Sequence, residues 1–111
     1  MRLGTYIEIE VETADGTSIG EPFITKNASD ALSFVRTSLQ PGIAIILACI
    51  GNGVDYGNLV VEAVSPGICN LRALEHRGFA ISDVSVEQAL DAVQYWLPQQ
   101  ERTPTLAWHD E

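Results

Sequence analysis

The side chains that could support catalysis or bind metal in this chain are two histidines, two cysteines and 15 acids. His76 lies in H-R-G and His109 in W-H-D-E, without a histidine four residues on or a C-x-x-C motif, so neither predicts a metal site. A nucleophile and a base can be named in Cys69 and His76, but almost any chain of this length allows such a pair. No spacing singles out two of the acids as a catalytic pair. We therefore expect a protein that is not an enzyme and that uses no metal or cofactor.

Carboxylates dominate the charge, since 15 acidic residues against 6 basic ones give a net charge of −9. This charge excludes direct binding of nucleic acid through a basic footprint, and it disfavours docking on an anionic membrane. It fits either a basic protein partner or plain solubility. Glu8, Glu10 and Glu12 recur at every second residue, so a strand would place them in a row about 7 Å apart. That row is either a solvated face that discourages edge pairing or an electrostatic patch for a basic partner.

The N-terminal part of the chain predicts two strands and a helix. Alternation over 3–11 predicts a half-buried strand, and an Asp-Gly turn signal follows it. A return strand over 18–25 contains Pro22, which predicts an edge position. Asn27 is a natural cap for an amphipathic helix that runs to Leu39 and ends before a Pro-Gly pair.

The middle of the chain predicts the centre of a sheet. Residues 43–50 are apolar on both alternating faces, which predicts a central strand covered on two sides. The glycine-rich stretch 51–58 superficially resembles a dinucleotide-binding fingerprint, but a strand over 59–64 follows it and the required helix does not. We therefore expect a long hairpin loop, in which Asp55 and Tyr56 are exposed candidates for contacts.

The C-terminal part predicts a capped helix and a last strand. Ser85 is a natural N-cap, and Gln88 completes a capping box before a stripe of apolar residues. Pro98 should end the helix, because it lacks the N–H and restricts the residue before it. Residues 105–108 then predict a short strand that ends on Trp108, which we expect in the core together with Trp96.

The predicted order is strand, strand, helix, three strands, helix, strand, in a single domain over residues 1–111. Hairpin signals rather than helices join most strands, which predicts an α+β fold: a mostly antiparallel sheet with two amphipathic helices packed on one face. The third middle strand covers 68–74, and 79–81 leads into the second helix. Cys49 and Cys69 lie in apolar runs and should be free core thiols. Without a long apolar run or a recognisable secretion signal, we expect a cytoplasmic protein.

The segment 84–111 combines a capped helix rich in alanine and aromatics, a short loop and a strand ending in tryptophan and acids. It resembles the C-terminal signature of the first numbered family of immunity proteins from bacterial polymorphic-toxin and contact-dependent growth inhibition systems. One member of that family is the immunity partner of a DNA cytosine deaminase toxin. The matching positions are Glu87, Ala89, Ala92, Trp96, Leu97, Glu101, Arg102, Pro104, Leu106 and Trp108.

The resemblance implies an antitoxin that binds and blocks one cognate protein toxin, a basic domain such as a nuclease or deaminase. The signature itself is structural and assigns no binding residue. The competing interpretation is a non-catalytic small-ligand-binding or oligomerisation module, and a homodimer stays open. We take exposed acids and one tyrosine as toxin-binding candidates, because acids complement a basic cleft and tyrosine suits an interface anchor. These candidates are Glu8, Glu10, Glu12, Asp55, Tyr56, Glu62 and Glu75.

Overall fold

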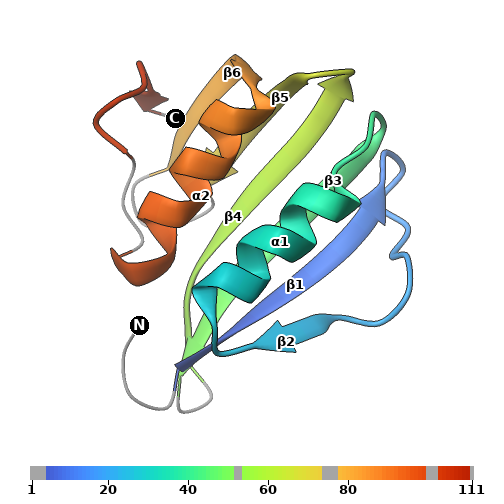
Figure 1. The fold of residues 1–111 in the computed structure, drawn as a ribbon, viewed down its shortest axis with the longest axis vertical. Helices are drawn as coiled ribbons and strands as arrows, with labels where there is room; N and C mark the ends of the chain where they lie inside the picture. Colours follow the sequence, from blue (N-terminus) through green and yellow to red (C-terminus); the bar gives the residue numbers. More distant parts are fainter. Residues whose placement is uncertain (1–4, 52–53, 74–77, 100–102, 111) are drawn as a thin grey trace.

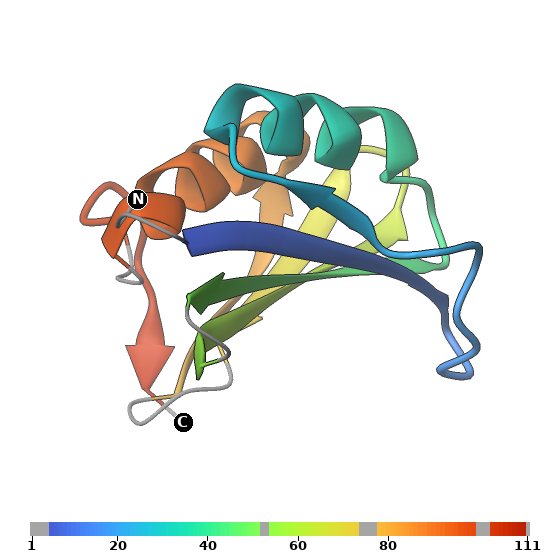
Figure 2. The same ribbon diagram turned by 90° about the horizontal axis from the view of Figure 1, so that it is seen from below.

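A computed structural model describes residues 5–51, 54–73, 78–99 and 103–110. Within these ranges the strands form one antiparallel sheet in the order β2-β1-β3-β4-β5-β6-β7, and both helices lie on the same face of it (Figures 1 and 2). The predicted α+β class is confirmed. The elements are β1 (Thr5–Thr13), β2 (Phe23–Thr25), α1 (Ala28–Ser38), β3 (Ile43–Gly51), β4 (Val54–Ser65), β5 (Ile68–Ala73), β6 (Phe79–Ser85), α2 (Val86–Gln99) and β7 (His109–Asp110).

β3 lies near the middle of the sheet, between β1 and β4, as its apolar sequence predicts. Ile45, Leu47 and Cys49 point to the helices and are fully buried. The prediction that both faces of β3 are covered is wrong for the part of the chain that the structure describes. No described helix or strand packs on the other face, where the side chains of β3 are half-buried (Figure 2).

The core lies between the sheet and the two helices. Ala31 and Val35 of α1, together with Trp96 and Leu97 of α2, are fully buried against the inward side chains of the strands. Cys49 and Cys69 are both buried and form no disulfide with each other, as expected. Trp96 is a core residue as predicted, whereas Trp108 is only half-buried at the edge of the core.

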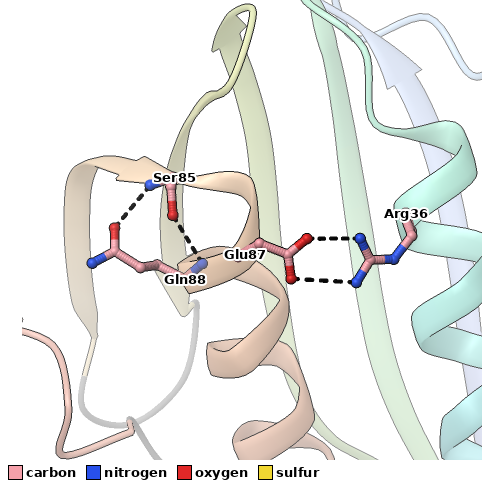
Figure 3. Close-up of polar contacts among 4 residues, drawn as sticks. All are labelled: Arg36, Ser85, Glu87 and Gln88. Atoms are coloured by element: carbon pink, nitrogen blue, oxygen red, sulfur yellow. Dashed lines mark hydrogen bonds and ion pairs between the residues drawn. The ribbon is translucent and has the colours of Figure 1, made fainter.

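Both helices begin at the predicted caps. The side chain of Asn27 accepts hydrogen bonds from the backbone N–H groups of Ser29 and Asp30, at 2.8 and 3.2 Å. At α2, the Ser85 hydroxyl accepts from the Gln88 N–H at 3.1 Å, and the Gln88 side chain accepts from the Ser85 N–H at 2.9 Å (Figure 3). Each bond satisfies a backbone donor that the helix geometry leaves without an internal partner.

An ion pair joins the two helices beside this cap. Nη1 of Arg36 lies 2.7 Å from Oε1 of Glu87, and Nη2 donates to Oε2 at 3.4 Å (Figure 3). The hydrogen bond from Arg36 lowers the pKa of Glu87, and the same contact raises the pKa of Arg36. Because both side chains are largely exposed, this pair contributes little to the stability of the fold.

The prediction that α2 ends before Pro98 is wrong, since the helix runs to Gln99. A proline removes one hydrogen bond to the carbonyl four residues earlier, which here belongs to Gln94. Gln94 is exposed, so water can satisfy that carbonyl at small cost. Leu97 and Trp96 are fully buried just before the proline, and their packing holds the last turn helical.

β6 is a strand that the sequence pattern did not predict. Residues 79–81 are all buried, Ser82 and Asp83 are exposed and Val84 is buried again, so the alternation expected of a strand is broken. The cause is an irregularity opposite Cys69 and Leu71, where Asp83 adopts a positive φ of 61°. The Asn70 side chain accepts from the Asp83 N–H at 3.0 Å, which satisfies the donor that the irregular pairing leaves unpaired.

Three predicted boundaries also shift. The predicted return strand over 18–25 is short, since β2 covers only Phe23–Thr25, although its edge position is confirmed. The glycine-rich stretch 51–58 is mostly strand, because β4 already begins at Val54. The last strand is His109–Asp110 rather than 105–108.

Trp108 explains the shift of the last strand. Its indole Nε1 donates to the carbonyl of Thr103 at 2.8 Å, and its ring meets Phe79 edge-on at 5.1 Å between centroids. These contacts fold residues 103–106 into a turn and leave only the residues after Trp108 to pair with β6. In the described ranges, no helix is both long and apolar enough to cross a membrane.

Candidate functional site

The candidate site is the face of the sheet opposite the helices, which we call the open face. On β1, Ile7 and Ile9 point into the core, so Glu8 and Glu10 point outward. The same alternation places every second residue of β3, β4 and β5 on the open face. Figure 2 shows both helices on the other side of the sheet.

The pairing register sets which side chains are neighbours on this face. Glu10 lies opposite Ile46, Ile46 opposite Val60, and Val60 opposite Arg72. One row therefore runs from an acid on β1, across two apolar side chains, to a cation on β5. Opposed residues on antiparallel strands have Cβ atoms about 5 Å apart, so these four side chains form a continuous surface.

The rows on either side repeat the acid-to-apolar order. Glu12 lies opposite Ala44, which in turn lies opposite Glu62. Glu8 lies opposite Ala48. Glu8, Glu10 and Glu12 thus form one acidic row along β1. Beside it runs an apolar strip, which we define as Ala44, Ile46, Ala48 and Val60.

The carboxylates of this face have no protein partner among the described residues. The ion pair among the described residues is the one between Arg36 and Glu87, and these two residues lie on the helix side of the sheet. The acidic row is half-buried and Glu62 is exposed, and no described side chain neutralises any of the four acids. Arg72, a cation on this face, lies on β5, so β3 and β4 separate it from the acidic row. The face therefore combines uncompensated negative charge with apolar area.

Two shallow depressions flank Glu62. One of about 210 Å³ lies across β4, β5 and β6, and Arg72 and Val60 are part of its wall. The other, of about 400 Å³, lies near the turn that enters β3 and includes Ala44. A surface with apolar area, charged side chains and shallow hollows suits a partner that inserts side chains.

The structure brings together four of the seven residues that the sequence singled out. Glu8, Glu10, Glu12 and Glu62 share the open face. Three others are separate cases: Asp55 and Tyr56 lie in β4 rather than in an exposed loop, and their side chains are outside the described part, as is all of Glu75.

Sequence reasoning missed the apolar strip and Arg72. The signal for the strip was present, because β3 is apolar on both faces while helices are available for only one. Arg72 carried no signal, since its position beside Val60 depends on the register of β4 and β5.

The described residues give little support for a metal site or for a reactive cysteine. They contain no group of three or more His, Cys, Asp or Glu side chains arranged to hold a metal ion. Burial raises the pKa of the Cys69 thiol, which disfavours the reactive thiolate. No protein-family model matches the chain, and no curated protein or solved structure is significantly similar to it.

Proposed function

We propose that this protein is an immunity protein, which binds and neutralises a cognate toxin of a bacterial polymorphic or contact-dependent-inhibition system. The toxin is a basic domain that acts on nucleic acid. The observation that carries the proposal is the open face, where four acids without a described partner border an apolar strip on an uncovered sheet.

Such a face has the composition of a binding surface. Desolvated apolar area supplies affinity at the centre of an interface, while charges at its border steer the partner and set its orientation. The net charge of −9 raises the rate of encounter with a basic protein and lowers it for nucleic acid or anionic lipid. A basic protein domain is therefore the partner that both features favour.

The C-terminal segment supports the same class. Its resemblance to the immunity-family signature rests on a capped helix, a short loop and a strand ending in tryptophan and acids; in the structure the strand begins only after Trp108. The capping box at Ser85 and Gln88 and the anchored ring of Trp108 give the capped helix and the tryptophan a structural role. The acidic row and the apolar strip are made of other residues, so the segment supports the class of protein and the open face supports the binding site.

Binding and growth rescue test the proposal. The toxin domain encoded immediately upstream is immobilised and the purified protein is passed over it, and the two are also co-expressed in a sensitive host. We expect a tight complex and restored growth. Complete absence of both, with a correctly folded protein, would contradict the proposed function.

Two matched variants locate the surface. Glu10→Gln removes one charge from the acidic row, and Asp91→Asn removes one exposed charge from α2 on the helix side. Both change the net charge from −9 to −8. If the open face is the interface, Glu10→Gln slows association clearly more than Asp91→Asn does, because a contact charge acts at shorter range than a distant one.

A further inference from the structure

Resting on the proposed function, we infer that the open face occupies the nucleic-acid-binding cleft of the toxin, rather than a surface away from it. The uncovered sheet face offers the two things that such a cleft recognises, which are a regular line of negative charge and apolar area beside it. Inhibition would then be competitive with the toxin's substrate.

The line of charge comes from strand geometry. Successive residues of a strand rise by about 3.4 Å, so side chains two apart on one face lie about 7 Å from each other. Glu8, Glu10 and Glu12 therefore repeat at a distance similar to that between successive phosphates of a nucleic acid strand, with one negative charge per repeat. Cationic groups spaced to contact successive phosphates can contact these carboxylates in the same way.

The apolar strip lies next to the acidic row, in the position that the bases occupy next to the phosphates of a nucleic acid strand. A cleft for single-stranded nucleic acid pairs a positive groove, which follows the backbone, with aromatic side chains on which the bases stack. On the open face, Ala48, Ile46 and Ala44 lie directly beside Glu8, Glu10 and Glu12 in the pairing register, and Val60 follows on the next strand. Aromatic side chains that normally stack on bases would therefore meet the apolar strip.

Other occupants of the face fit less well. Nucleic acid is repelled by the acidic row, and Arg72, the cation that the described register places on this face, lies on the far side of the apolar strip. In a second copy of this chain, the open face would again present a row of carboxylates without a basic row to complement it. A basic cleft complements both the charge and the apolar area.

A competition assay between the protein and an oligonucleotide tests this inference directly. A catalytically inactive form of the toxin domain is bound to a fluorescein-labelled single-stranded DNA or to the RNA of the same sequence, and the protein is titrated in. We expect the protein to displace the oligonucleotide, with a fall in anisotropy, and to require higher concentrations as salt is raised. In the variant with Glu8, Glu10 and Glu12 all changed to Gln, displacement should need at least roughly tenfold more protein. Asp91→Asn should displace like the unchanged protein.

Gel filtration of the same mixtures separates this inference from the proposed function. A ternary complex of toxin, protein and oligonucleotide would overturn the inference and leave the immunity function intact. A toxin that binds the protein but neither oligonucleotide would also overturn it. If the protein forms no complex with the toxin at all, the proposed function itself fails.

Discussion

The acidic row should weaken the fold while it strengthens binding, which gives a prediction with two opposite readouts. We expect the triple variant Glu8→Gln, Glu10→Gln and Glu12→Gln to be more stable than the unchanged protein and to bind the toxin less well. The three substitutions change the net charge from −9 to −6 and keep the size and shape of each side chain. The alternative, a solvated face that only discourages edge pairing, predicts no loss of toxin binding in this variant.

The gain in stability follows from the spacing. Two unit charges about 7 Å apart repel by about 0.6 kcal/mol in water before screening. At physiological salt, with a Debye length of about 8 Å, each neighbouring pair retains about 0.25 kcal/mol, so the two pairs of the row repel by about 0.5 kcal/mol. At 0.01 M salt the repulsion grows to about 1 kcal/mol. For a chain of this length these values correspond to a rise in Tm of about 2 °C and about 4 °C.

Thermal unfolding at two salt concentrations measures the first readout, and stopped-flow association with the toxin measures the second. We expect the variant's advantage in Tm to shrink as salt rises and its association rate to fall by roughly tenfold at low salt. Asp91→Asn is the control, since it changes one charge away from the row. A triple variant that is less stable at every salt concentration, or one that associates at the unchanged rate, would refute the reasoning.

Three further predictions concern the fold. Ser85→Ala should destabilise the protein by about 1 kcal/mol through loss of the N-cap, lowering Tm by about 4 °C in a thermal melt; no change would show that α2 does not depend on its cap. Hydrogen bonds from Thr13 and Thr17 lower the pKa of Asp15 from 3.8 to about 2, so its carboxylate stabilises the folded state above about pH 4, and this contribution is lost as the pH falls toward 2. In denaturant titrations, Asp15→Asn should therefore be less stable than the unchanged protein at pH 6, with a gap that closes near pH 2; a gap constant with pH would contradict this. Both cysteines are buried, so a thiol reagent should label them only at the rate of unfolding, and fast labelling of the native protein would contradict the packing around them.

Features set by local chemistry could be predicted from the sequence. Asn27 and Ser85 cap their helices because a side-chain oxygen there reaches the free N–H groups of the first turn, which depends only on neighbouring residues. The outward direction of Glu8, Glu10 and Glu12 follows from the two-residue period of a strand. These predictions needed no knowledge of what packs where.

Features set by packing between distant segments could not be predicted. β6 lacks the expected alternation because its register with β5 shifts between Cys69 and Leu71. This shift depends on the pairing of two strands and cannot be seen in the sequence of either strand alone. Pro98 remains in a helix because buried neighbours hold the last turn, against the local preference. The turn at Thr103 forms because the Trp108 indole reaches back to its carbonyl.

The open face combines both kinds of feature, because the direction of its side chains follows from strand alternation and its neighbours are set by the pairing of distant strands. Its composition can therefore be compared with that of an ordinary solvent-exposed sheet face. A sheet face that only had to remain soluble would carry polar side chains across its central strands, since those strands expose most of its area. Here β3 presents Ala44, Ile46 and Ala48, whereas the carboxylates lie on β1 and, at Glu62, on β4. Apolar area beside charged side chains is a combination found in protein interfaces. Neither the stability of the sheet nor its solubility requires apolar side chains on this face of β3, and their position beside the carboxylates is what led us to propose a binding surface here.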